Sequence, residues 1–541
     1  MNNSYDYIIV GAGAAGCVLA NRLSEDRDVK VLLLEAGGMD RHPILKLPIA
    51  WTQVSADPRF NWNYFTEPEP SLGGRQVFCA RGKVLGGSTS INAMRYSRGH
   101  ARDYDQWRQL GNVGWGYADV LPYFKRSENN WRGENKYHGG DGPLRVRLST
   151  ASHLMYEPHA AAAKAAGIPE SEDIHGDQQE GMTRAELTVN GFSRRHSTAR
   201  AFLMPALRRK NLTLVTHALT TRVRVDNGRA VGVDYVKGGN KHSVTADREV
   251  ILSGGAYNSP QLLMLSGIGA ADALRAHGIA PVVDLPGVGK NLAEHPLIPL
   301  VMQAQPASSY MQHLRMDRAA WWTAIWALTG GGPFSVNGNT AGLFARTRPE
   351  LERPDVQLIF AASARDSRLW WPGRPGTQKP SLQCSISLQH PEALGDLILR
   401  SANPADPPRI RLNLFGAQSD IDTVIRGLRL AREIYAKEPL KSMVVGELLP
   451  GVGVTSDAAL RQHVLATAST TQHPCGTCKM GNDAMAVVDD QLRVRGVKAL
   501  RVADASVMPT IPGGHINAPT IMIGEKAADL VRGRTLAPAA V

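Results

Sequence analysis

Three side chains near the C-terminal end of the sequence are suited to acid–base or hydrogen-bonding chemistry: His473, His515 and Asn517. An imidazole with a pKa near neutrality can take a proton from a hydroxyl group, and an amide can hold an oxygen on which charge develops. Each also has a structural alternative. His473 could be a loop histidine bonded to backbone, and Asn517 could be a turn asparagine. The residue types alone leave this choice open.

The cysteines point to no comparable chemistry. The chain has five, an odd number, which argues against a disulfide framework. Cys475 and Cys478 form a C-x-x-C, but no second pair stands at zinc-binding spacing and no thioredoxin-like context surrounds them. We therefore expect an incidental pair and no metal site.

The N-terminal segment has the pattern of a dinucleotide-binding unit. We predict a strand over Tyr7–Val10, a glycine turn over Gly11–Gly16, a helix over Cys17–Ser24 and a second strand over Val29–Leu34. Glu35 ends the second strand and follows Gly16 by 19 residues, the spacing of a carboxylate that bonds ribose hydroxyls.

The glycines of this turn have separate predicted roles. Gly11 permits the tight turn, Gly13 lets the backbone approach a pyrophosphate, and Gly16 lets the helix pack closely on the strand. The start of the helix then offers free N–H groups to phosphates. The pattern fits NAD as well as FAD, while Glu35 disfavours a 2′-phosphate.

A second glycine segment, Ala80–Ala93, favours FAD. Its glycine pair, Gly86 and Gly87, is followed by small hydroxyl residues, so the backbone can lie against a planar ring and its phosphates. FAD is long enough to use both glycine segments.

These motifs resemble those of the glucose-methanol-choline (GMC) oxidoreductase family, including its bacterial choline dehydrogenase-like and other FAD-dependent alcohol dehydrogenases. Ala80–Ala93 resembles the first family signature, and Gly255–Gly269 resembles the second. Further matching segments follow in the family's order: Leu285–Leu292, His473–Gly481, Leu500–Pro509 and Gly514–Thr520. The resemblance covers about residues 5 to 533.

The resemblance implies an α/β fold, α+β overall, with a Rossmann-like FAD-binding domain and a substrate-binding domain built on an antiparallel sheet. The FAD domain is expected from residues 1–150, 195–300 and 465–541, and the substrate domain from 151–194 and 301–464. In the sequence itself, predicted strands over 212–216, 249–253 and 500–502 meet turn or helix signals, as in α/β units. The segments 356–360 and 382–389 alternate as antiparallel strands do.

The resemblance also assigns roles to residues. It makes His473 the base and Asn517 the second member of the active-site pair, while His515, two residues away on the same side of an extended segment, competes for that role. The residues it implies for FAD binding are Gly11, Gly13, Ala14, Ala15, Gly16, Glu35, Ala36, Arg81, Val84, Gly86, Gly87, Ser88, Asn92, Ala93, Val223, Asp504, Ala505, Asn517 and Thr520. Choline-oxidising members link FAD covalently through a histidine before the asparagine of the first signature. Ile91 stands there, which predicts non-covalent FAD.

Composition and charge limit the kinds of partner that we expect for this protein. The net charge is +12, but the basic residues are dispersed with no basic run interleaved with aromatics, so we expect no nucleic-acid partner. No apolar stretch reaches the length of a membrane span, and no secretory signal precedes the first strand. We expect a cytoplasmic protein, with peripheral membrane association left open, and a buried or cleft-covering helix over residues 319–328.

The expected reaction is oxidation of an alcohol to the aldehyde by hydride transfer to flavin N5. Tryptophans in the expected substrate domain, at positions 321, 322, 326, 370 and 371, favour an apolar or aromatic primary alcohol. An oxidase using O2, a choline- or sugar-type polyol dehydrogenase, and a non-redox hydroxynitrile lyase of the same family stay open. So does the electron acceptor, which could be a quinone, a dye or O2.

Overall fold

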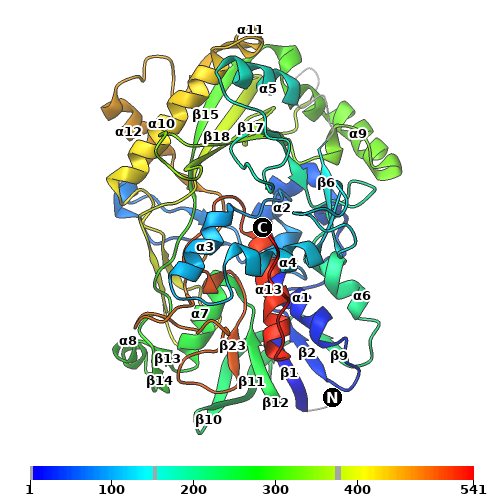
Figure 1. Ribbon diagram of the computed structural model, residues 1–541, viewed down its shortest axis with the longest axis vertical. Helices are drawn as coiled ribbons and strands as arrows, with labels where there is room; N and C mark the ends of the chain where they lie inside the picture. The colour runs from blue at the N-terminus through cyan, green and yellow to red at the C-terminus, as the bar shows by residue number, and fades with distance from the viewer. Residues whose placement is uncertain (1–3, 150–154, 372–378) are drawn as a thin grey trace.

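A computed structural model of the protein describes residues 4–149, 155–371 and 379–541. Two sheets of different construction organise these residues (Figure 1). The lower layer is a mostly parallel sheet with helices packed on it, and the upper layer is an antiparallel sheet below helix α10 (Gln418–Tyr435).

The first sheet has a parallel centre. Its strands are β1 (Ser4–Val10), β2 (Val31–Leu34), β9 (Leu212–Val215), β12 (Asn240–Leu252) and β23 (Leu500–Val502), in the spatial order β23-β12-β1-β2-β9. Each neighbouring pair in this set is parallel. Two antiparallel strands, β10 (Leu219–Asp226) and β11 (Arg229–Lys237), extend the sheet beyond the N-terminal half of β12.

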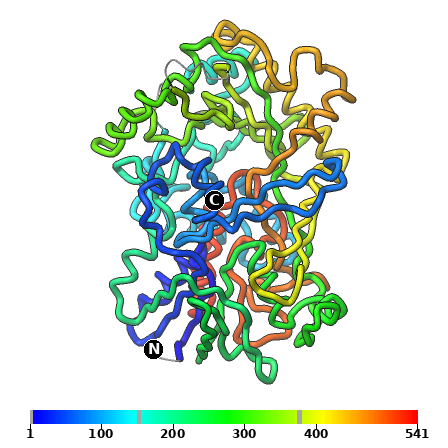
Figure 2. Tube along the Cα trace, turned by 180° about the vertical axis from the view of Figure 1, so that it is seen from behind, coloured from blue at the N-terminus to red at the C-terminus, as the bar shows by residue number. Residues whose placement is uncertain are grey.

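The central strands carry long apolar runs because both faces of a parallel sheet are covered. All four residues of β2 are buried, as are the last four of β1. Helix α1 (Ala14–Leu23) and the C-terminal helix α13 (Asn517–Val531) cover the sheet together, although the chain separates them by nearly 500 residues. They pack so closely that a Cβ on Gly524 would lie 2.9 Å from the Cα of Ala15. Figure 2 shows the C-terminal segment among N-terminal and central ones.

The second sheet is antiparallel throughout. Its order is β21 (Val444–Leu449), β15 (Pro296–Ala304), β18 (Ser381–Leu388), β17 (Val356–Ala361), β16 (Asn339–Ala345) and β7 (Gly181–Arg184), and β22 (Ser469–Thr470) pairs with β15. Helix α10 packs against one face: a Cβ on its Gly427 would lie 2.8 Å from Ile386 and 3.3 Å from Val356. α5 (Tyr156–Ala165) and α12 (Asp457–Thr467) lie at the same end of the molecule.

Alternation along these strands separates the sheet into two chemical faces. On β18, Leu382, Cys384 and Ile386 are buried toward the helix side, while Gln383 and Ser385 line a cavity. On β17, Ile359 and Ala361 line the same cavity. The polar face of the second sheet therefore closes a space above the first layer.

The mixed α/β fold with a parallel and an antiparallel sheet agrees with the sequence prediction. All seven segments predicted as strands in these sheets are observed within two residues or overlap longer strands, as β1 and β12 do. Two short departures concern the division of the chain: β15 begins at Pro296 and β22 at Ser469, so both belong to the antiparallel sheet although they start inside ranges expected for the FAD domain.

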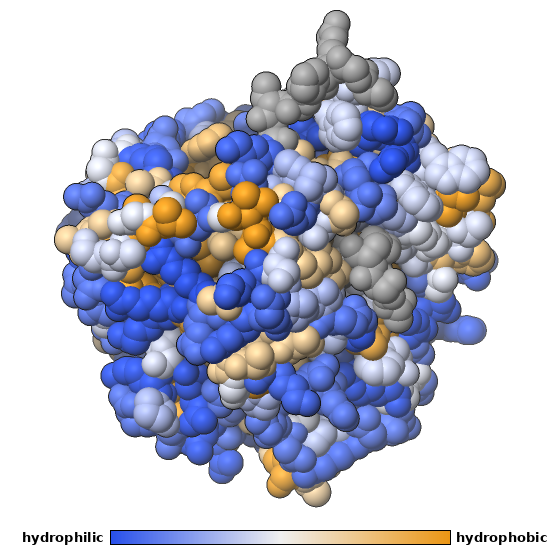
Figure 3. All heavy atoms as spheres, turned by 90° about the horizontal axis from the view of Figure 1, so that it is seen from above, coloured by the Kyte–Doolittle hydropathy of each residue, from blue (hydrophilic) through white to orange (hydrophobic). Residues whose placement is uncertain are grey.

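The helix predicted over residues 319–328 as buried or cleft-covering does form, but it is not buried. Helix α9 (Met316–Thr329) forms there, but it buries only Ala319 and Trp326, and its Trp321 and Leu328 are 61% and 80% exposed. Its apolar residues encircle the helix, so it cannot bury them all against one surface. No helix among the described residues is long and apolar enough to cross a membrane. Seen from above, the surface is largely hydrophilic with separate hydrophobic patches (Figure 3).

Candidate active site

One large cavity lies between the two layers. Its volume is about 410 Å³, within the range of roughly 300–1,000 Å³ that small-molecule and cofactor pockets have, and its lining extends from the first sheet to the second. We call its lining from the first layer and the glycine loops the dinucleotide side (Gly11–Ala15, Glu35–Ala36, Gly87–Asn92, Ser253–Ala256 and Asp504–Ala505). The lining from Arg95, the second sheet, residues 363–365 and 367, and the two histidines is the substrate side.

The predicted glycine roles hold on the dinucleotide side. Gly11 has φ +100°, which only glycine adopts without strain, and a Cβ on Gly16 would lie 1.9 Å from the carbonyl oxygen of Gly11. A Cβ on Gly13 would meet nothing nearer than 3.8 Å, because this residue faces the cavity. The N-terminus of α1 has no side-chain cap, so its first N–H groups are free for a phosphate. The cradle fits a dinucleotide pyrophosphate.

Two buried carboxylates complete this side. Glu35 accepts hydrogen bonds from the N–H groups of Ala12 (2.9 Å) and Gly37 (2.7 Å), and burial raises its pKa to about 7. Asp504 accepts from the N–H groups of Gly255 and Ser506, both at 2.8 Å, and burial raises its pKa as well. These bonds hold both carboxylates at the cavity wall, where Glu35 can meet ribose hydroxyls.

Most residues predicted to bind FAD line the cavity: Gly11, Gly13, Ala14, Ala15, Glu35, Ala36, Arg81, Gly87, Ser88, Asn92, Ala93, Asp504, Ala505, Asn517 and Thr520. Four do not. Gly16 and Gly86 lie behind the wall, where a Cβ would collide at 1.9 Å and 2.3 Å, and Val84 is buried. Val223 is fully buried in β10 and its N–H donates to Ser266 Oγ, so its backbone is occupied within the protein.

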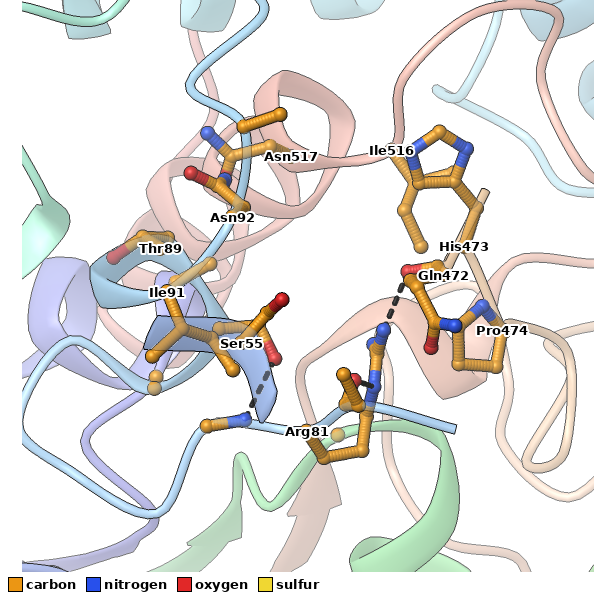
Figure 4. Close-up of a pocket in the computed structure, with 18 of the residues that line it drawn as sticks. Ser55, Arg81, Thr89, Ile91, Asn92, Gln472, His473, Pro474, Ile516 and Asn517 are labelled. Atoms are coloured by element: carbon orange, nitrogen blue, oxygen red, sulfur yellow. Dashed lines mark hydrogen bonds between the residues drawn. The ribbon is translucent and has the colours of Figure 1, made fainter. Parts of the chain in front are cut away.

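A residue that is far away in the sequence, Arg195, holds the second glycine loop in place. Arg195, with 5% of its surface exposed, donates to Asn92 Oδ1 at 2.8 Å and to the carbonyl oxygen of Thr89 at 3.2 Å. Asn92 Oδ1 also accepts from the N–H of Met94, so its amide NH₂ is left to face the cavity. Ile91, at the position of the family's covalent link, is an apolar lining residue next to Asn92 (Figure 4). No local sequence pattern pointed to Arg195, because its partner Asn92 is about a hundred residues away along the chain.

The predicted base, His473, lies in the cavity wall with all its ring contacts to other polar groups. Its Nδ1 is 2.7 Å from Thr471 Oγ1 and 3.0 Å from His295 Nδ1, and its Nε2 is 3.3 Å from His515 Nδ1. Burial, reinforced by His515, His295 and Arg81, lowers its pKa well below the usual value. The imidazole is therefore neutral near pH 7 and able to accept a proton.

The neighbours of His473 also fix which ring nitrogen is free. His295 Nε2 faces the carbonyl oxygen of Gln389 at 2.9 Å and must donate to it. The pKa of His295, lowered by burial to about 3, keeps it neutral, so its Nδ1 is an acceptor. His473 Nδ1 then carries the proton toward His295, and the lone pair lies on its Nε2, which is 3.3 Å from His515 Nδ1.

His515 is the side chain that meets this lone pair. Its ring centre is 5.0 Å from that of His473, and its backbone N–H donates a hydrogen bond to Ser97 Oγ at 2.7 Å. Burial and the nearby positive charge of Arg95 lower its pKa well below the usual value. The rings of His473 and His515 thus form a pair of neutral imidazoles at one point of the wall.

Asn517, predicted as the partner of His473, lies elsewhere. It is the first residue of α13 and makes no hydrogen bond to His473 among the described residues. Figure 4 shows its side chain beside Asn92, across the view from His473 and Ile516. The structure therefore brings His515 rather than Asn517 to the base, because the chain turns between them as α13 begins.

A carboxyl group supports the histidines from behind. Glu294 Oε1 accepts from the backbone N–H groups of His473 (2.7 Å) and His295 (3.0 Å), and burial raises its pKa to about 7. Arg81 lies near Glu294 and donates to the carbonyl oxygen of Gln472 (Figure 4). Sequence analysis gave Glu294 and His295 no part in the chemistry, because their contacts with the base span about 180 residues of the chain.

Two expectations about other residues have different outcomes. Cys475 and Cys478 are both buried free thiols, consistent with an incidental pair. The tryptophans that favoured an apolar alcohol do not line the cavity: Trp321 and Trp371 are each 61% exposed, and Trp326 is buried but does not belong to the lining. The aromatic residues that do line it are Trp51, Trp62, Phe78 and Tyr310.

Comparison with known proteins places this arrangement in a class. The GMC oxidoreductase model matches residues 5–297 with its N-terminal part and residues 391–524 with its C-terminal part. Mitochondrial choline dehydrogenase of Mus musculus is 44% identical over 98% of this chain and 90% of its own length, and oxygen-dependent choline dehydrogenase of Rhizobium etli is 41% identical over 98% and 96%.

Solved structures agree. Pyridoxine 4-oxidase from Mesorbium loti superposes with a TM-score of 0.87 at 30% identity, over 97% of this chain and 98% of its own. A formate oxidase variant from Aspergillus oryzae, solved in connection with FAD modification, superposes with a TM-score of 0.91 at 29% identity, over 98% of both chains. Fold and site together define an FAD-dependent oxidoreductase acting on alcohols. The chain belongs to the GMC oxidoreductase family, and FAD is its cofactor.

Proposed function

We propose that the protein oxidises a primary alcohol to the aldehyde, with His473 Nε2 as the base. The observation that carries the proposal is the hydrogen-bond chain from Gln389 through His295 to His473, which leaves a neutral imidazole lone pair at the cavity wall. A base with this geometry accepts the hydroxyl proton as the carbinol carbon loses its hydride.

We also propose His515 as the second group at the reacting oxygen. Its imidazole lies 3.3 Å from His473 Nε2, so a hydroxyl bound at this point meets both rings, and an N–H of His515 would hold the developing alkoxide. Asn517 lies beside Asn92, which supports a role toward the cofactor.

The cofactor's place follows from the cavity wall. Gly13 and the start of α1 fit its pyrophosphate, Glu35 its ribose, and Ser88 and Asn92 the flavin end. When bound, FAD supplies the hydride acceptor at flavin N5, so the alcohol loses one hydroxyl proton and one hydride and a C=O bond forms. We propose that FAD is held without a covalent bond, because Ile91 offers no nucleophile; acid precipitation should release all the flavin into the supernatant.

The proposal is tested by adding alcohols anaerobically to the purified yellow protein. Bleaching of the flavin absorbance with formation of aldehyde is the expected result. Absence of bleaching together with cleavage of a cyanohydrin would favour a lyase instead. Repeating the reaction in air, with and without a quinone or dye, then identifies the electron acceptor.

Choline is a second candidate substrate, because relatives with more than 40% identity are named choline dehydrogenases. An apolar or aromatic alcohol loses the support it had, since the tryptophans on which it rested lie outside the cavity.

A further inference from the structure

The substrate side of the cavity carries positive charge without negative charge. Among the described lining residues the carboxylates are Glu35 and Asp504, and both are bound to backbone N–H groups on the dinucleotide side. The charged side chains on the substrate side are Arg95 and Arg365.

Arg95 is built into the wall rather than lying on it. It is 7% exposed, and its Nη1 donates to the carbonyl oxygen of Ala341 at 3.3 Å. Gly342, the next residue of β16, makes room for the guanidinium, since a Cβ there would lie 2.6 Å from Arg95 Nη2. The positive charge is also close enough to His515 to depress the pKa of that imidazole.

The guanidinium has little to satisfy it within the protein. It has five N–H donors and makes one long hydrogen bond to a neutral carbonyl among the described residues. No ion pair joins it to any described carboxylate, and burial alone lowers its pKa to about 10. A buried charge without a partner is costly, and such a group in a cavity marks a place where a ligand supplies the counter-charge.

Arg365 is a second cation in the lining of the same side. Its backbone N–H donates to Gln383 Oε1 at 2.8 Å, and its guanidinium carbon lies 5.3 Å from the ring centre of Trp51. Burial lowers its pKa too, and no described carboxylate pairs with it. An anion approaching the histidines therefore meets favourable charge along its path.

We infer that the substrate is an alcohol that also bears a carboxylate, held by Arg95 while its hydroxyl group contacts both His473 and His515. A planar guanidinium binds a carboxylate through two parallel N–H bonds, which also orients the molecule. A quaternary ammonium such as choline meets two cations and no counter-ion on this side of the cavity. This inference rests on the proposed oxidation of alcohols.

A first experiment compares substrates of one shape and different charge on the unmodified holoenzyme. Choline, its neutral isostere 3,3-dimethylbutan-1-ol, and ω-hydroxycarboxylates of three to six carbons with their amides are each mixed anaerobically with the enzyme, and flavin reduction is followed by stopped flow. The quantity to compare is the limiting rate of flavin reduction divided by the dissociation constant of the substrate. For at least one hydroxycarboxylate we expect this ratio to exceed that of the matching amide by on the order of 10-fold or more. Choline should be slower than the neutral isostere.

A second experiment locates the preference. Arg95→Met should lower the ratio of reduction rate to dissociation constant for the preferred carboxylate by on the order of 10- to 100-fold, mainly by raising the dissociation constant. The same ratio for the amide should change by less than about 3-fold. Arg95→Lys keeps the charge and should retain part of the preference, which covers the case of a poorly folding Met variant. Arg348→Met, at an exposed arginine outside the cavity lining, is the matched control and should change neither.

The outcomes separate the two proposals. Choline reducing the flavin faster than its neutral isostere, or Arg95→Met slowing carboxylate and amide equally, would overturn the inference while leaving alcohol oxidation intact. The second pattern would instead assign Arg95 to the electrostatics of the flavin. Reduction by none of the alcohols would overturn the proposed function and the inference with it.

Discussion

The two sides of the cavity satisfy their polar groups in different ways. On the dinucleotide side, Glu35 and Asp504 are bound by nearby backbone N–H groups, and the glycines that shape the turn lie within six residues of one another. On the substrate side, His473 depends on His295 and His515, and Arg95 is without a counter-charge. On the first side the protein's own backbone satisfies the carboxylates, whereas on the second side Arg95 has a charge that only a ligand can balance.

This difference predicts different consequences of mutation. Changes on the substrate side should lower the rate and leave the bound FAD in place. Changes on the dinucleotide side should lower FAD content or stability and leave the chemistry of the remaining holoenzyme unchanged.

The largest expected effect is that of His473→Ala. Removing the base should slow flavin reduction by about 10²- to 10⁴-fold, because His473 is the imidazole whose Nδ1 proton is directed to His295 and whose Nε2 can therefore accept the hydroxyl proton. FAD content, measured from the ratio of flavin to protein absorbance, should equal that of the unmodified enzyme. Loss of FAD without a change in the rate per bound flavin would contradict the division into two sides.

The next effect distinguishes His515 from Asn517. His515→Ala should slow flavin reduction by roughly 10²-fold, as loss of a hydrogen bond to a developing alkoxide does, and Asn517→Ala should slow it less. The comparison is made per bound flavin, because Asn517 lies beside Asn92 and its loss should reduce FAD content. A larger rate loss from Asn517→Ala would restore that residue as the partner of His473.

The same division explains what the sequence could and could not predict. The β1–α1–β2 unit, its glycines and Glu35 are adjacent in the chain, and their spacing reports their geometry directly. The alternation in β17 and β18 likewise predicted antiparallel strands. By contrast, the contacts of His473 with His295 and of Arg195 with Asn92 span 178 and 103 residues, and no local pattern encodes them.

The misplacement of Asn517 and of helix α9 has a related physical cause. His515 and Asn517 would share a side in an extended strand, but α13 begins at Asn517 and turns the two side chains apart. In α9 the tryptophans suggested burial, but the apolar residues lie all round the helix and only one face of it can pack against the protein.

A third prediction separates shape from stability on the dinucleotide side. Gly16→Ala should destabilise the protein by about 1–3 kcal/mol, because its Cβ would lie 1.9 Å from the carbonyl oxygen of Gly11. Gly13→Ala should leave the unfolding of the FAD-free protein within about 0.5 kcal/mol, since its Cβ faces the cavity, but should weaken FAD binding. Thermal unfolding without FAD and titration with FAD measure the two effects. Equal destabilisation by both changes would contradict the assigned roles.

The smallest expected effect is in the pH dependence of flavin reduction. The base works only when unprotonated, so the rate falls as pH drops through the pKa of His473. Burial and the facing groups His515, His295 and Arg81 lower that pKa well below the ordinary value near 6.5, so the rate should stay level from pH 8 to below pH 6.5.

The group that could disturb this plateau is Glu294, whose pKa is raised by burial to about 7 and whose carboxyl oxygen is 2.7 Å from the backbone nitrogen of His473. Above that pH its negative charge raises the pKa of the nearby imidazole, and below it the carboxyl is neutral. Measuring the profile in Glu294→Gln removes this titration. A change in rate near pH 7 that disappears in Glu294→Gln is caused by titration of the Glu294 carboxyl group. A fall in rate at or above pH 6.5 that persists in Glu294→Gln would show that His473 retains an ordinary pKa. The description of His473 and His515 as a buried pair of neutral imidazoles would then be wrong.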